Sequence, residues 1–80
     1  MTRDEWIASF ALAAGVERPS TEEVRELLEL AGTAAHASER TAAPLACWIA
    51  GRSGLTLAQL RGLAESIGEA DGGEAPAPGA

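Results

Sequence analysis

The fold of this chain is decided by the stretch STEEVRELLELAGTAA, residues 20–35. Ser20 and Glu23 are spaced as a capping box, in which the serine hydroxyl accepts the Glu23 amide hydrogen and the Glu23 carboxylate accepts the Ser20 amide hydrogen. The stretch therefore predicts a helix that begins after Pro19 and frays near residues 38–40. Its apolar side chains recur at helical spacing. They are Val24, Leu27, Leu28, Ala31, Ala34 and Ala35.

Two further capping boxes predict two further helix starts. Residues 2–5, TRDE, open a helix that Gly15 should end, and residues 56–59, TLAQ, open a helix that Gly68 should end. Helical spacing gives each helix an apolar face expected to pack inside the protein. In the first helix the face comprises Trp6, Phe10 and Ala13, with Ile7, Ala11 and Ala14 beside them. In the last it comprises Leu57, Leu60, Leu63, Ala64 and Ile67.

A fourth helix is predicted between these, from Pro44 to the glycines at 51 and 54, because proline is favoured at the first helical position. Residues 45–50 are apolar in succession, so we expect this helix to be buried on most sides and to lie centrally. The run is also compatible with a strand, but no other segment resembles a pairing partner. We therefore predict an all-α, compact four-helix bundle over residues 1–68, followed by a disordered Gly/Ala/Pro/acidic tail over residues 69–80.

Composition narrows the functional classes. The chain has 80 residues and a net charge of −6, from 12 acidic and 6 basic side chains. An acidic protein is repelled by a polyphosphate backbone, so we do not expect nucleic-acid binding. The polar start does not resemble a signal peptide, and no apolar run approaches the length of a membrane span. We expect a cytoplasmic protein that does not bind membranes, and its single cysteine excludes an intramolecular disulfide.

One polar cluster is a candidate ligand site. His36 and Arg40 are four residues apart, so a continuing helix would place them on one face. The amides at the next helix start, near Ala43 and Pro44, could add hydrogen-bond donors for a phosphate or carboxylate. The alternative, which we favour, is a structural polar edge in which Arg40 ties the connection to Glu39 or to a carbonyl.

The apolar run carries the other candidate residues. Leu45, Cys47 and Trp48 are assigned to a partner interface. A nucleophilic Cys47 would need a base and an electropositive setting, so we favour a buried structural thiol. One histidine and one cysteine cannot form a closed zinc site. We therefore predict no catalytic residues, no metal and no cofactor.

Four short motifs resemble a known family. They are Ala-His at 35–36, Arg40, Ala-Ala-Pro-Leu at 42–45 and Trp-Ile-Ala-Gly at 48–51, and an early tryptophan, Trp6, fits as well. This order is similar to an actinobacterial family of small domains of unknown function. The resemblance covers about residues 2–67 and departs at Thr41, where the family pattern has proline.

Domains of that family stand alone or are fused to the C-terminus of molybdenum-cofactor guanylyltransferases. The resemblance thus implies a link to the assembly of molybdopterin guanine dinucleotide, and it supplies no catalytic residues. The leading hypothesis is a non-catalytic accessory or interaction domain whose partner is that enzyme or a second copy of itself. The alternatives are an anionic-ligand module that uses His36 and Arg40, for a nucleotide or pterin phosphate, and an enzyme acting through Cys47.

Overall fold

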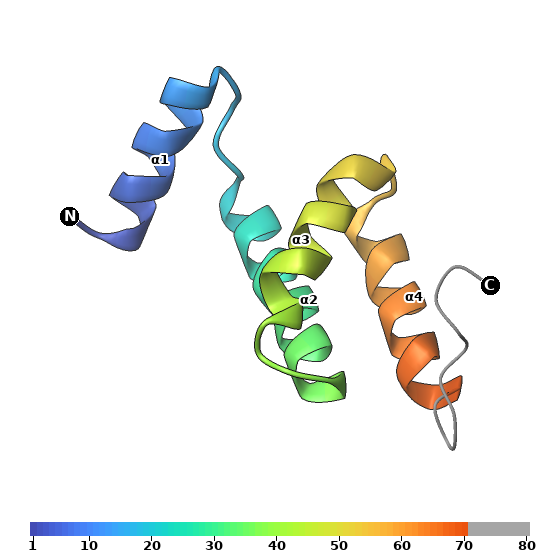
Figure 1. Ribbon diagram of the computed structural model, residues 1–80. Coiled ribbons are helices and arrows are strands. Elements are labelled where there is room, and N and C mark those ends of the chain that lie inside the picture. The colour runs from blue at the N-terminus through green and yellow to red at the C-terminus, as the bar shows by residue number, and fades with distance from the viewer. Residues whose placement is uncertain (71–80) are drawn as a thin grey trace.

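The computed structural model describes residues 1–70 and contains four helices in that range (Figure 1). They are α1 (Arg3–Ala14), α2 (Thr21–Ala37), α3 (Ala42–Ser53) and α4 (Leu57–Ala70). Residues 1–70 contain no strand, and the predicted all-α, four-helix architecture is confirmed. Most of the predicted tail, residues 71–80, lies outside the described residues, so its disorder stays a prediction.

All three predicted capping boxes form. The Thr2 hydroxyl accepts a hydrogen bond from the Glu5 amide at 3.1 Å, and the Thr2 amide donates to the Glu5 carboxylate at 2.8 Å. The same reciprocal pair of bonds closes the boxes at 20–23 and 56–59. Each box satisfies amides that a helix start leaves unpaired, which is why three helices begin where the sequence predicts.

Two predicted boundaries are wrong by two residues. Helix α3 begins at Ala42, ahead of Pro44, and passes through Gly51 to Ser53, where Gly54 caps it with φ +75°. Proline is tolerated there because the first turn of a helix needs no amide hydrogen for intrahelical bonding. Helix α4 likewise continues past Gly68 to Ala70. A glycine costs a helix about 1 kcal/mol, which weakens it without ending it.

The core lies where α2 packs against both α3 and α4. Leu30, Ala50 and Leu60 form its buried cluster, one from each helix, and Leu57 and Ala64 pack against it. The central helix is therefore α2, and the prediction that the helix of residues 45–50 lies centrally is wrong. A run that is apolar all round shows only that every side of the helix can be buried. Which side is buried depends on the neighbouring helices.

The predicted buried face of α2 also needs correction. Leu30 is the most buried leucine of the chain, with 5% of its surface exposed, although it was not included in that face, whereas Leu28 is more than half exposed. Leu30 follows Leu27 by three residues and precedes Ala34 by four, so it lies on the same side of the helix as they do. In α4, the expected burial is wrong for Leu63 and Ile67, which are also more than half exposed.

Helix α1 lies to one side of the other three, joined to α2 by residues 15–20 (Figure 1). It ends at Gly15, whose φ of +79° gives the left-handed cap that the sequence predicts. Only Ala11 of α1 is buried, and Ile7 is half-buried. The predicted packing of Trp6 and Phe10 inside the protein is wrong, because both are exposed.

Candidate functional site

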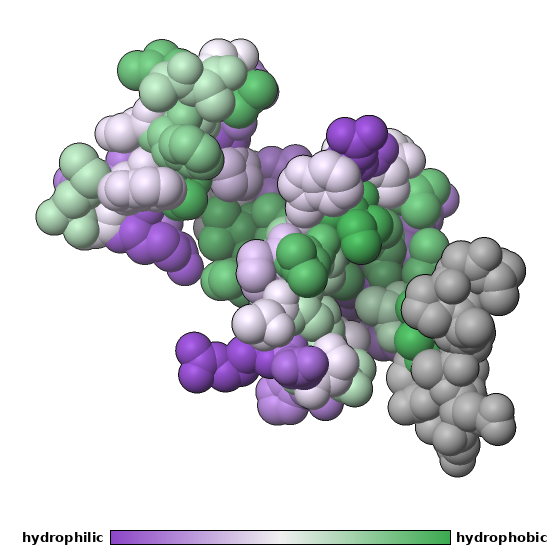
Figure 2. Space-filling model, in the orientation of Figure 1, coloured by the Kyte–Doolittle hydropathy of each residue, from purple (hydrophilic) through white to green (hydrophobic). Residues whose placement is uncertain are grey.

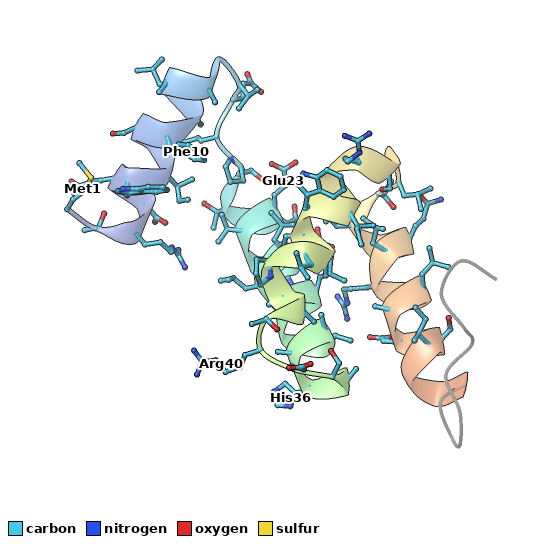
Figure 3. The ribbon with its side chains drawn as sticks, viewed as in Figure 1. Met1, Phe10, Glu23, His36 and Arg40 are labelled. Carbon is cyan, nitrogen blue, oxygen red and sulfur yellow. The ribbon has the colours of Figure 1, made fainter. Side chains whose placement is uncertain are left out.

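The predicted anion-binding residues lie at the end of α2 that is farther from α1 (Figure 3). His36 is in the last turn of α2, but the helix ends at Ala37, so Arg40 belongs to the connection that follows. The premise of one continuous helical face is therefore wrong. Both side chains are exposed, and they extend in different directions from the chain.

The start of α3 offers few amides to an anion. The Ala42 amide donates to the Glu39 carbonyl at 2.9 Å, and the Ala43 amide donates to the Arg40 carbonyl at 3.1 Å. Pro44 has no amide hydrogen. The first three residues of α3 thus have no amide that is both present and unoccupied, which removes the donors that make most helix starts attractive to anions.

The predicted partner-interface residues lie on a more informative surface. Leu45 and Trp48 are more than half exposed, and Cys47 beside them is half-buried. Ile49, which sequence reasoning did not select, is equally exposed and lies four residues after Leu45. We call Leu45, Trp48 and Ile49 the α3 face. Their spacing of three and four residues is that of one helix face, which is the signal that could have found Ile49.

Arg52 completes this face at its C-terminal end. Its guanidinium lies over the Trp48 ring, 4.7 Å from the ring centroid. A cation in that position is attracted by the electrons of the indole face. Arg52 is also the only charged residue of α3. The α3 face is therefore an apolar surface with a single positive charge at one end.

A second apolar surface lies on α1. The rings of Trp6 and Phe10 pack with their centroids 5.1 Å apart and their planes inclined by 31°. They are 54% and 60% exposed, respectively, and Trp48 is 63% exposed. We call Trp6 and Phe10 the α1 face. The sequence placed these residues together correctly, but their exposure follows from the position of α1, which the sequence did not reveal.

Two hollows flank the connection between α1 and α2. The first, of about 460 Å³, lies between the N-terminal half of α1 and the start of α2 and includes Ile7, Val24 and Leu28 in its lining. The second, of about 530 Å³, is lined by residues of α2, α3 and α4 that include Leu27 and Cys47. Neither is lined by His36 or Arg40. The candidate anion residues therefore lie outside both of these concave surfaces.

Several charged side chains form ion pairs on the surface, within one helix or between two. Arg61 of α4 pairs with Glu29 of α2 at 3.0 Å, and Arg25 lies 3.7 Å from both Glu22 and Glu29. Exposed pairs of this kind contribute at most about 1 kcal/mol. Within residues 1–70, no group of three or more His, Cys, Asp or Glu side chains could hold a metal ion. No helix in that part of the chain is long and apolar enough to cross a membrane.

Comparison with known proteins places the chain in a family. No curated protein and no solved structure matches it. A family model does match, and it covers residues 1–72, which is nearly the whole chain and includes all four helices. The chain therefore belongs to the family described as domain of unknown function DUF6457.

Proposed function

We propose that this chain is a non-catalytic protein-interaction domain. The observation that carries the proposal is the exposure of all three aromatic side chains of the sequence, Trp6, Phe10 and Trp48, each by more than half. Tryptophan and other aromatic residues are enriched at protein interfaces and at the residues that dominate binding energy. A monomer that exposes all of its aromatic residues has the surface composition of a binding partner.

The burial of leucine, isoleucine and valine supports the same conclusion. Among these larger side chains only Leu30 and Leu60 are buried, whereas eight of the same types are exposed. They are Leu12, Val16, Leu28, Leu45, Ile49, Leu55, Leu63 and Ile67. Small domains often need disulfides, metals or partners to supplement a core of this size. A partner that covers part of this surface would add apolar burial that the isolated domain lacks.

The cellular context of the proposal rests on the motifs at residues 35–51. Their resemblance to an actinobacterial family fused to molybdenum-cofactor guanylyltransferases makes such an enzyme the first partner to test. The function would then be accessory to the assembly of molybdopterin guanine dinucleotide, in the cytoplasm. The net charge of −6 supports a protein partner over a nucleic acid.

Calorimetry with the guanylyltransferase of the same organism tests the proposal. Binding should have a negative heat-capacity change, since apolar surface is buried. Trp48→Ser should weaken it more than tenfold if the α3 face is used, whereas Leu63→Ser on α4 serves as an exposed control that keeps wild-type affinity. A domain that binds no guanylyltransferase and also stays monomeric would overturn the proposal.

The anionic-ligand module remains a second candidate because His36 and Arg40 are exposed at the same end of α2. It ranks behind the interaction domain, since the Ala42 and Ala43 amides already donate to carbonyls. Titration with GTP and molybdopterin guanine dinucleotide, followed by the His36 ring signals in NMR, tests it. Binding that disappears in Arg40→Ala would favour this module, and the absence of any shift would reject it.

A further inference from the structure

We infer that two copies of this chain form a symmetric dimer in which the α1 face of each copy covers the α3 face of the other. This inference rests on the proposed function and names the chain itself as one partner. The α1 face is Trp6 with Phe10, and the α3 face is Leu45, Trp48 and Ile49.

The arrangement of the two faces favours a second copy over an unrelated protein. Both faces are apolar and exposed, and the two helices make no extensive contact with each other within one chain. Figure 2 shows apolar side chains over α1 and over α3 on the same side of the molecule. In a two-fold dimer, a contact between surface A and surface B is always accompanied by the contact between B and A. One association step would therefore cover both faces of both copies.

The exposed area of the two faces is a large share of what such a dimer needs. Aromatic side chains have about 150–250 Å² to bury, so Trp6, Phe10 and Trp48, each more than half exposed, present on the order of 350 Å². Leu45 and Ile49 are exposed to a similar degree and extend the same surface. A stable interface buries about 800 Å² on each partner. The two faces thus supply the apolar centre of a standard interface, and their polar surroundings would supply its rim.

Charge and helix-dipole complementarity favour one direction in which the helices cross. Arg52 is the only charge of α3 and follows Trp48 by four residues. The first turn of α1 carries Glu5 together with Asp4, which already pairs with Arg3 at 2.9 Å. If α1 runs antiparallel to the partner's α3, with Phe10 beside Trp48, Arg52 lies opposite Trp6, one residue from Glu5. Trp6 precedes Phe10 by four residues, just as Arg52 follows Trp48 by four, and four residues span about 6 Å on either helix. The antiparallel direction also brings opposite ends of the two helix dipoles together.

Sedimentation equilibrium of the full chain tests the dimer. The wild type should form dimers at concentrations of about 10–100 µM. Phe10→Ser and Trp48→Ser should each weaken dimerisation more than tenfold, while Leu63→Ser, an exposed change outside both faces, should not. Helix content measured by circular dichroism should stay unchanged in all three variants, because each replaced side chain lies on the surface. A wild type that stays monomeric, or a Leu63→Ser variant that dissociates as readily as Trp48→Ser, would overturn the dimer.

Mixing the two interface variants tests which faces meet. The Phe10→Ser chain keeps an intact α3 face and the Trp48→Ser chain keeps an intact α1 face, so a mixed dimer contains one undamaged contact. We expect the mixture to dimerise more strongly than either variant alone. If α1 packed on α1 and α3 on α3, every contact in the mixed dimer would be damaged and mixing would give no recovery, which would reject the proposed pairing.

The same samples separate this inference from the proposed function. A monomeric wild type that still binds the guanylyltransferase through the α3 face rejects the dimer and supports an interaction domain. A wild type that neither dimerises nor binds the enzyme rejects both.

Discussion

Helices α1 and α2 begin with equivalent capping boxes but differ in how they pack. Helix α2 forms a unit with α3 and α4, whereas α1 lies to one side. The capping boxes at 2–5 and at 20–23 close with the same bonds at the same distances. Helix α2 then packs against two helices, whereas α1 buries only Ala11. Capping residues act within one turn, so they fix where a helix begins. Whether its apolar face is covered depends on a complementary surface elsewhere, which for α1 we place on a second copy.

The largest expected loss of stability comes from the core shared by α2, α3 and α4. Leu30→Ala should lower the free energy of unfolding by about 2–4 kcal/mol, because it removes a buried leucine that packs with Ala50 and Leu60. Urea unfolding followed by circular dichroism measures the change. The matched control is Leu28→Ala, two residues earlier and more than half exposed, which should cost less than about 1 kcal/mol. Equal losses in the two variants would show that Leu30 is no more important to the core than Leu28.

A smaller effect is expected at the left-handed caps. Gly54→Ala places a Cβ on a residue with φ +75°, which should cost about 1–2 kcal/mol of global stability. Outside Gly54 and its two chain neighbours, no atom lies within 4 Å of the added Cβ, so the cost is backbone strain. Gly15→Ala, at φ +79° with equally open space, should instead loosen the end of α1 and leave the urea midpoint nearly unchanged. A comparable shift from both substitutions would show that α1 unfolds together with the rest.

The substituted residues also show how much of the molecule could be predicted from the sequence. Four helices and three of their starts were predictable because capping boxes and left-handed glycines are local signals. The positions of Leu28 and Leu30 were not, since apolar spacing shows which residues share a face and not which face meets another helix. The helix that contains Trp48 was expected to be buried on most sides for the same reason, although Trp48 itself was assigned to a partner interface. The apolar run at residues 45–50 correctly predicted a helix with apolar residues on every side. The exposure of Trp48 followed only from the central position of α2, which leaves one side of α3 uncovered.

The capping boxes allow a finer comparison. Ser20→Ala should lower global stability by about 1 kcal/mol, because its box opens the helix that holds the core. Thr2→Ala removes an equivalent bond but should fray only α1. Hydrogen exchange distinguishes them: Thr2→Ala should accelerate amide exchange within residues 3–14, and Ser20→Ala should accelerate it throughout α2, α3 and α4. Uniform acceleration in both variants would argue for one cooperative unit that includes α1.

The smallest expected effect concerns the ion pair between α4 and α2. Arg61→Gln removes the 3.0 Å contact with Glu29 and should cost no more than about 0.5–1 kcal/mol, because both side chains are partly exposed. Raising the salt concentration should shrink the difference between variant and wild type, since the pair is screened. A loss above about 2 kcal/mol would place this pair, rather than Leu30, at the centre of the α2–α4 contact.

The position of the two tryptophans has an optical consequence. Trp6 lies against Phe10 on one face, and Trp48 lies beneath the Arg52 guanidinium on the other, so each face carries one indole in its own electrostatic setting. Trp6→Phe therefore leaves an emission spectrum that reports on α3 alone, and Trp48→Phe leaves one that reports on α1 alone. An indole that leaves water shifts its emission to shorter wavelength. Without any added label, the emission of these two variants can thus show whether α1 and α3 are covered by a partner at the same concentration, or which helix is covered first.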